Sequence, residues 1–366
     1  MSAPPGTNRD LRIDFLRGFF IVSLAGSHFA WFASVAGYHS IARFYDMQPF
    51  GFSGPAEFFV FFSGYVMALV LGRNYDRVGF WLTQARTLDR AWSLYVLNTF
   101  TLAIVAGGAW FLFLRSPELM AVSHIDRFLE NPAKFLYNFL IFKENFAFFE
   151  VLRNYIFFIP LVAAFLAMAR LHVAVPLGFS FLLWLAHQAG LTAQFHYATF
   201  NPFAWQFIFF LGAGIALIKP LTEWRFPRRR LQITICALLL LAAFTVKMTV
   251  FAGIQAENIP YAEKAGVGPL RVLHFGLALW TAMLITPSSD TLRHSKIVMS
   301  FVAVGQNSLE CFCLNNILVY GGAHLLIYNV TSVPLYFSIL GTIMALVLAG
   351  GRMFGWFKAA PWTRRA

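Results

Sequence analysis

Continuous apolar runs of about 20 residues constrain the fold of this chain most strongly. A helix of that length crosses a hydrocarbon core ~30 Å thick. Charged residues make up only 12% of the 366 residues, whereas soluble globular domains carry about 25%. Within the runs, apolar residues follow one another rather than alternating with polar ones, which disfavours a transmembrane β-barrel. The sequence therefore predicts an all-α polytopic membrane protein.

Ten apolar segments are candidates for membrane-spanning helices. They are residues 14–36, 55–73, 91–114, 149–169, 172–188, 202–218, 231–251, 269–286, 297–320 and 333–351. An even number of spans places both termini on the same side of the membrane. One set of alternate connections holds most of the Lys and Arg residues, and the other holds only Arg43, Arg115, Arg127, Lys134, Lys143 and Lys264. By the positive-inside rule, both termini are expected in the cytoplasm.

Residues 1–366 are expected to form a single transmembrane domain, because no internal repeat, low-complexity tract or soluble domain is visible. The longest outer connection, 115–148, contains an apolar run at 135–142. This run is too short to span and is expected to lie on the surface or re-enter the bilayer. The N-terminal segment has a passable cleavage site at Ser34–Ala36, but its polar residues favour retention over removal as a signal peptide.

Two ionisable residues, Arg17 and His28, lie inside the first predicted helix. They are almost three turns apart, so they share one helix face and stand about 16 Å apart along the axis. An arginine in the bilayer costs about 2.5–3.5 kcal/mol on insertion scales, so it usually faces a protein-lined or wet interior. Asp14 lies one turn before Arg17 and is expected to pair with it. His28 either accepts a proton from an attacking hydroxyl or packs through one hydrogen bond.

Further charged residues stand at the predicted outer ends of the second and eighth helices. Glu57 opens the second helix near the level of His28, and it either orients that histidine or is an interfacial acid. Arg271 and His274 lie one turn apart in the eighth helix. Arg271 is a candidate to bind an acidic acyl or sugar group, and the alternative is that it extends to the interface.

A polar group interrupts the ninth apolar segment at Gln306, Asn307, Ser308 and Glu310. Amide and hydroxyl side chains of this kind commonly form hydrogen bonds between membrane helices. Glu310 needs a partner, and Arg153 is the candidate. Five arginines lie on the predicted cytoplasmic side, namely Arg86, Arg90, Arg228, Arg229 and Arg230. They either bind the phosphates of the donor or only determine the membrane topology.

Several common catalytic patterns are missing from the sequence. It contains no Gly-rich phosphate loop, no Cys/His metal spacing, no nucleophile elbow and no carboxylate pair. Cys236, Cys311 and Cys313 lie in apolar runs, so neither a disulfide nor a metal site is expected. The net charge of +12 could suggest nucleic-acid binding, but the basic residues lie between apolar runs. This placement indicates that they set the membrane topology.

Six segments together resemble a known family. The spacing of Arg17 and His28 resembles the signature of the membrane acyltransferase-3 superfamily. Within it, residues 9–18, 57–65, 90–96, 200–206 and 269–275, with Asn-Ser-Leu at 307–309, are similar to OpgC-type proteins, which succinylate osmoregulated periplasmic glucans. These matches occur in order along the chain.

The resemblance implies ten helices and a multi-pass location in the bacterial inner membrane. It implies that His28 is the catalytic histidine and Arg17 its essential partner on the donor side. Substrate contacts are expected either from this resemblance or from the residue pattern, and the candidates are Asp14, Asn201, Trp205, Gln206, Arg271, His274, Ser308 and Glu310. Arg86 and Arg90 are the candidates for binding the donor.

The chain departs from the OpgC pattern at three positions. Ser27 precedes His28 where Asp is frequent, Ala30 stands in place of Pro, and Asn98 stands where histidine is common. Ser27 cannot act as an anionic partner of the imidazole, so we consider Glu57 as a substitute.

These observations predict an inner-membrane O-acyltransferase with no permanently bound cofactor. Succinyl-CoA, or acetyl-CoA, is the expected donor, and a periplasmic glucan is the expected acceptor, deprotonated by His28. One alternative is O-acetylation of another surface polysaccharide. Another is a transporter or flippase for a lipid-linked sugar, although no repeated halves with broken helices are visible. The expected partners are acyl-CoA, polysaccharide and membrane lipids, not nucleic acid. The sequence leaves the oligomeric state open, and also whether His28 carries the acyl group covalently.

Overall fold

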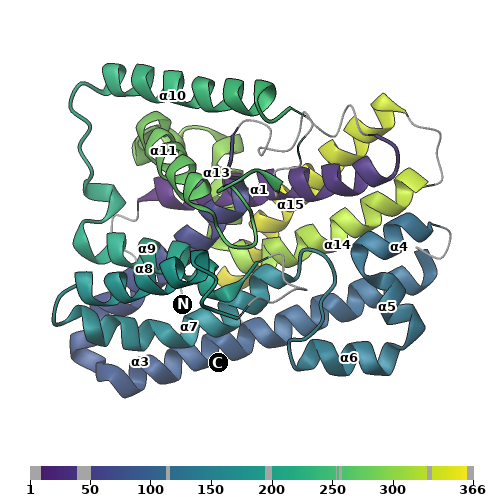
Figure 1. Ribbon diagram of the computed structural model, residues 1–366, viewed down its shortest axis with the longest axis horizontal. Helices are drawn as coiled ribbons and strands as arrows, with labels where there is room; N and C mark the ends of the chain where they lie inside the picture. Colours follow the sequence, from purple (N-terminus) through teal and green to yellow (C-terminus); the bar gives the residue numbers. More distant parts are fainter. Residues whose placement is uncertain are drawn as a thin grey trace.

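The computed structural model describes residues 10–38, 51–112, 116–193, 200–252, 254, 258–327 and 332–360. Across these ranges the chain is helical and no residue lies in a strand, which confirms the predicted all-α class (Figure 1). The elements are α1 (Leu11–Val35), α3 (Pro55–Leu112), α4 (Pro117–Ser123), α5 (Ile125–Glu130), α6 (Pro132–Leu140), α7 (Glu150–Ala169), α8 (Ala174–Gln188), α9 (Pro202–Ile218), a 3-10 turn (Leu221–Glu223), α10 (Arg229–Thr249), α11 (Pro269–Ile285), α12 (Ser289–Arg293), α13 (Lys296–Gln306), α14 (Ser308–Ile327) and α15 (Val333–Ala359).

Five of the described helices are long and apolar enough to cross a membrane, namely α1, α3, α7, α10 and α15. A sixth span results if α13 and α14, which are bent by 98° at their junction, are taken as one. The apolar helices α8, α9 and α11 have 15, 17 and 17 residues, fewer than the ~20 that a perpendicular span needs. The chain is therefore a helical membrane protein. Ten spans and cytoplasmic termini stay predictions, and both ends of the chain lie outside the described residues.

Helix α3 differs from the expected pair of separate spans. Residues 74–90, predicted as a connection, are helical, so α3 has 58 residues. It breaks at Gly79, whose φ of 73° and ψ of 179° are not helical, and Figure 1 shows the resulting sharp turn. Glycine adopts a positive φ without a Cβ clash, so a single residue reverses the path. Beside the break, Arg170 pairs with Asp76 at 2.8 Å.

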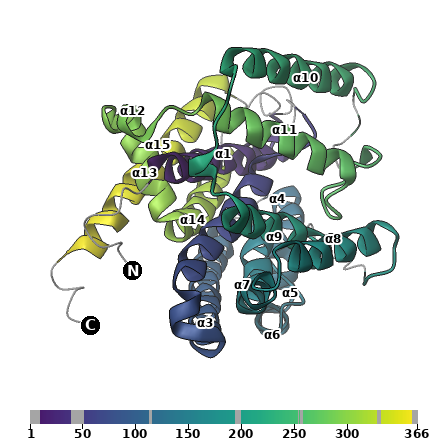
Figure 2. The same cartoon turned by 90° about the vertical axis from the view of Figure 1, so that its left-hand side faces the viewer.

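Helices α1 and α13 pack with their backbones in contact. A Cβ on Gly18 would lie 1.8 Å from the Phe301 carbonyl oxygen, and a Cβ on Gly305 would lie 1.8 Å from the Asp14 carbonyl oxygen. Small residues permit this close approach of membrane helices. Helix α1 also contacts α3, α14 and α15, and Figure 2 shows it among them. The polar residues of α1 are thus positioned by protein on several sides.

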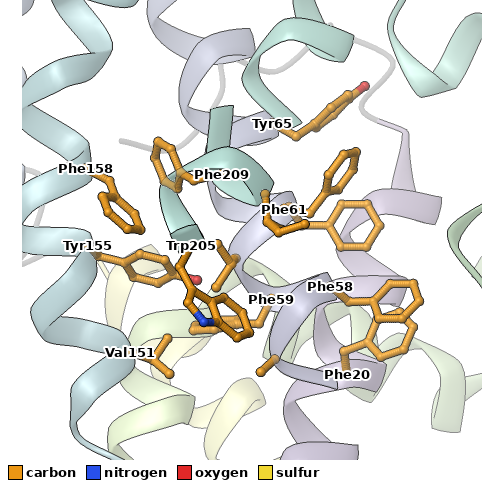
Figure 3. Packing of buried hydrophobic residues seen from close by; sticks show 14 of the residues in the cluster. Phe20, Phe58, Phe59, Phe61, Tyr65, Val151, Tyr155, Phe158, Trp205 and Phe209 are labelled. Atoms are coloured by element: carbon orange, nitrogen blue, oxygen red, sulfur yellow. The ribbon is translucent and has the colours of Figure 1, made fainter. Parts of the chain in front are cut away.

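Aromatic rings fill the space between α1, α3, α7, α9 and α14 (Figure 3). Phe20 of α1 stacks on Phe58 of α3 with ring centroids 3.7 Å apart. Phe59, one residue on, stacks on Phe312 of α14 at 5.2 Å. These contacts fix α1 and α14 against the first limb of α3, which is the arrangement that the candidate site depends on.

The predicted short apolar run at 135–142 falls mainly in α6, the last of three short helices in the long connection. The side chain of Asn131 caps α6 by accepting from the Lys134 N–H at 3.0 Å. Phe135 and Phe139 are buried, whereas Leu136, Tyr137 and Leu140 are exposed. A short helix that is apolar on its exposed face suits the membrane interface.

Candidate active site

His28 lies in the C-terminal half of α1 with its ring stacked on Phe148. The ring centroids are 3.8 Å apart and the planes differ by 8°. Trp31 and Phe32 contact the same phenylalanine edge-on. The buried Nδ1 of His28 has no hydrogen-bond partner among the described residues, and the same holds for the Ser27 hydroxyl. The aromatic contacts orient the imidazole and leave its Nδ1 without a partner in the described part of the chain.

Arg17 and Asp14 are both tied to the junction between α13 and α14. Arg17 donates through Nη2 to the Ser308 hydroxyl, at the first residue of α14. Asp14 accepts from Gln306 Nε2 at 3.2 Å, at the last residue of α13. The predicted Asp14–Arg17 pair stays a prediction. These two contacts dock the N-terminal half of α1 onto the bend.

The polar group at 306–308 is a helix break. Asn307 has φ −116° and ψ 40°, which ends α13. Its side-chain nitrogen donates to the carbonyl oxygens of Ala303 at 2.9 Å and of Gly351 in α15 at 3.1 Å. Breaks of this kind need side chains to satisfy the freed backbone groups. Asn307 therefore stabilises the bend, and its neighbours Gln306 and Ser308 reach α1.

Glu310 pairs with Lys358 of α15 at 2.8 Å. Arg153, the predicted partner, donates instead to the Phe142 carbonyl oxygen at 3.4 Å. The expected Glu310–Arg153 pairing is wrong, because the end of α15 brings a cation closer than α7 does.

Glu57 and Arg271 form a buried ion pair. Arg271 Nη1 lies 2.6 Å from Glu57 Oε1, and each side chain is 1% exposed. The other carboxylate oxygen accepts from the Gly54 N–H at 2.9 Å, and Arg271 Nε donates to the Ala262 carbonyl at 3.1 Å. The structure thus places Glu57 on Arg271 rather than on His28, and it neutralises the arginine that was expected to bind an acidic group.

His274 belongs to the same cluster. Its Nδ1 lies 2.7 Å from the Ser53 hydroxyl and 3.2 Å from the Ser53 backbone nitrogen. Lys247 of α10, which the sequence analysis missed, donates to the Gly51 carbonyl at 2.7 Å. A lysine in the apolar second half of α10 was the available signal. Together these side chains hold residues 51–54 at the start of α3.

Asn201, Trp205 and Gln206 are buried and bonded to protein groups. Asn201 caps α9 by accepting from the Phe203 N–H at 3.0 Å, and Trp205 donates to the Lys264 carbonyl at 2.9 Å. Gln206 accepts from the Ser180 hydroxyl and donates to the Ser180 carbonyl at 2.8 Å, which joins α9 to α8. These contacts fasten α9, and the cavity-lining role that the resemblance implied for the three residues stays a prediction.

Arg86 and Arg90 lie on the second limb of α3, half-buried and exposed respectively. From the basic run after the 3-10 turn, Arg229 donates through Nε to the Leu284 carbonyl at 2.7 Å. A donor-phosphate role for Arg86 and Arg90 stays a prediction.

The sequence analysis gave no role to Asn315 and Asn316 of α14, which are both 0% exposed. Polar residues inside an apolar helix were the available signal. In the described part of the chain, no group of three His, Cys, Asp or Glu side chains is close enough to hold a metal ion.

Comparison with known proteins gives one family. A sequence profile described as OpgC protein matches residues 9–359, a range that contains every described helix. No curated protein and no solved structure matches the chain significantly. The matched range covers nearly the whole chain, so the OpgC-type resemblance of the sequence segments is confirmed: the chain belongs to the OpgC protein family.

Proposed function

We propose that this protein is an integral-membrane O-acyltransferase that moves a succinyl group from cytoplasmic acyl-CoA to a hydroxyl of a periplasmic glucan. Membership of the OpgC family implies a transferase of the acyltransferase type in glucan modification. The catalytic part of the proposal rests on the His28 imidazole of α1. This ring stacks on Phe148, and its buried Nδ1 has no hydrogen-bond partner among the described residues.

His28 acts as the general base. It accepts the hydroxyl proton as the sugar oxygen attacks the thioester carbonyl carbon. The new C–O bond forms, the C–S bond breaks, and the leaving CoA thiolate takes up the proton from the imidazolium. The thioester is already activated, so positioning and base catalysis supply the acceleration.

Arg17 binds the donor at a distance from the reacting carbon. It stands about 16 Å from His28 along the helix axis, too far to touch a carbonyl beside the imidazole. Its contact with Ser308 places the guanidinium at the α13–α14 bend. We assign Arg17 to binding the polar arm of CoA, because a guanidinium forms hydrogen bonds with phosphate and amide oxygens.

Lys264 is the cation that contacts the free carboxylate of the succinyl group. Arg271 is neutralised by Glu57, so another positive charge is needed. The Lys264 ammonium lies 4.9 Å from the centre of the Phe200 ring. A dicarboxylic donor gives this lysine a partner that an acetyl donor does not.

Purified protein with labelled succinyl-CoA and a glucose oligosaccharide tests this function. His28→Ala is expected to abolish label transfer, because the variant lacks the proposed base. The matched control is His172→Ala, which changes an exposed histidine. Transfer by the His28 variant near the wild-type rate contradicts the proposal.

A transporter or flippase for a lipid-linked sugar is the second candidate. The 98° bend between α13 and α14 favours it, since discontinuous helices form substrate sites in transporters. Glycan movement across proteoliposomes without consumption of acyl-CoA supports that alternative. Thioester consumption matched by acylated glycan supports the transferase.

A further inference from the structure

Three buried asparagines near His28 have amide atoms that the protein does not satisfy. Asn315 and Asn316 of α14 are 0% exposed, and Asn98 of α3 is 3% exposed. Within the described part of the chain, Asn315 has no partner for either its oxygen or its nitrogen, and the oxygens of Asn98 and Asn316 also have none. Buried amides normally form hydrogen bonds, so such a set calls for a ligand.

Asn315 faces the first helix between Arg17 and His28. Helices α1 and α14 run in the same direction, because Arg17 contacts Ser308 near one end and Phe32 contacts Tyr320 at 5.0 Å further along. Asn315 follows Ser308 by seven residues, which is about two turns and about 10 Å. It therefore shares the face of Ser308 and lies short of the level of His28.

Asn316 and Asn98 flank the same region. The Asn316 side-chain nitrogen lies 3.5 Å from the carbonyl oxygen of Phe148, whose ring stacks on His28. Asn98 lies one turn before Thr101 on the buried face of α3, and Thr101 lies beside Cys313 of α14. Two helices, α3 and α14, thus carry these amides in the region of the proposed base.

The chemistry of the unsatisfied atoms selects the ligand. Three of them are acceptor oxygens, on Asn98, Asn315 and Asn316, and one is the donor nitrogen of Asn315. A thioester carbonyl or a carboxylate only accepts hydrogen bonds, so it cannot satisfy the oxygens. A sugar hydroxyl both donates and accepts, which matches an amide in either orientation.

We propose that Asn98, Asn315 and Asn316 form the binding site for the acceptor sugar, with Asn315 bound to a hydroxyl of the ring that is acylated. This inference rests on the proposed acyltransferase function and adds the residues that recognise the polyol. The amides hold the sugar on the α14 side of α1, and His28 meets its reacting hydroxyl.

Steady-state kinetics with a glucose oligosaccharide and succinyl-CoA test the assignment. Asn315→Leu removes both hydrogen-bonding atoms, so the KM for the oligosaccharide is expected to rise at least about tenfold, while the KM for succinyl-CoA stays within about twofold. Asn315→Ser keeps a donor and an acceptor and is expected to recover part of the loss. Asn307→Leu removes a buried amide that is bonded to Gly351, and it is expected to lower the folded yield without raising the oligosaccharide KM.

The outcomes separate the two claims. Wild-type protein that transfers no acyl group to the oligosaccharide defeats the proposed function. Transfer by the wild type with an unchanged oligosaccharide KM in Asn315→Leu overturns the sugar site alone and leaves these amides as water-binding groups. If Asn315→Leu does not fold, the KM of Asn316→Ala decides in the same way.

Discussion

Glu57 and Arg271 contact each other at 2.6 Å with both side chains 1% exposed. In sequence, each was a candidate for contact with substrate or with His28. The two side chains satisfy each other within the protein, whereas the buried Nδ1 of His28 has no hydrogen-bond partner among the described residues. Ionisable side chains that already have partners within the protein hold the fold. Those with an unused hydrogen-bonding atom are the candidates for chemistry.

Breaking the buried pair is expected to destabilise the protein strongly. Glu57→Gln leaves the Arg271 charge buried without its counter-ion, which typically costs about 3–5 kcal/mol. Thermal unfolding in detergent measures the loss. The double variant Glu57→Gln with Arg271→Met is expected to recover part of it, because no uncompensated charge remains. Equal unfolding temperatures for Glu57→Gln and wild type would contradict the importance of this pair.

Lys264 is expected to select the donor. Lys264→Met removes the positive charge, so the KM for succinyl-CoA should rise about tenfold while the KM for acetyl-CoA, which has no free carboxylate, changes little. Competition between the two donors measures the shift. Lys134→Met, at an exposed position on α6, is the matched control. Equal effects on both donors would remove Lys264 from this role.

Helix α1 owes its position to two features at the scale of elements. Its backbone meets α13 at Gly18 and Gly305, and its first turn is capped by Asp10. Asp10 accepts from the Arg12 N–H at 2.9 Å and from the Ser289 hydroxyl of α12 at 2.9 Å. Because His28 lies on the same helix, displacement of α1 also displaces the proposed base.

Enlarging the glycine contact is expected to disrupt the fold. The Cβ of Gly18→Leu would lie 1.8 Å from a backbone oxygen, so the helices must separate. The fraction of monodisperse protein in size-exclusion chromatography is expected to fall severely. Gly276→Leu is the control, since nothing lies within 4 Å of a Cβ at that position. A normal elution profile for Gly18→Leu would rule out the close approach.

The cap at Asp10 predicts a pH dependence of stability. Burial of Asp10 raises its pKa, but hydrogen bonds from Arg12 and Ser289 outweigh burial and hold the pKa below its usual 3.8. The stabilisation is therefore fully present above pH 3.8 and is lost as the pH falls through the lower folded-state value. Asp10→Asn is expected to lose stability at neutral pH and to show a smaller decrease in the acid range. Parallel unfolding curves for the two proteins across that range would exclude this contribution.

The helices were largely predictable from the sequence, and their junctions were not. Nine of the ten apolar segments fall mainly on one observed helix, with two of them sharing α3, whereas 297–320 covers both α13 and α14. The agreement arises because apolar run length reports directly on helices in lipid. The helical connection through residues 74–90 was missed, since charged residues there look like a loop although only Gly79 leaves the helical conformation. The sequence predicted a polar group around Asn307 but not the 98° bend there. The bend depends on a hydrogen bond from the Asn307 side chain to the carbonyl oxygen of Gly351 in α15, and sequence spacing does not reveal that contact.

At the scale of the whole molecule, long-range pairing decides which residues can form a site. Arg17 reaches Ser308 and Glu57 reaches Arg271 across more than 200 positions of sequence, and spacing within one helix cannot predict such contacts. Helical periodicity did place Arg17 and His28 on one face of α1. The residues around His28, including Phe148, Asn315 and Asn316, come from two other elements and emerge only from the assembled fold.

His28 is proposed as the base for acyl transfer between substrates that arrive from opposite sides of the membrane. Proteoliposomes with labelled succinyl-CoA on the cytoplasmic face and a glucose oligosaccharide on the other face test it most directly. Labelled oligosaccharide is expected with wild-type protein and none with His28→Ala at equal reconstituted amounts. Equal labelling by the two proteins, or labelling only when both substrates share one compartment, would contradict it.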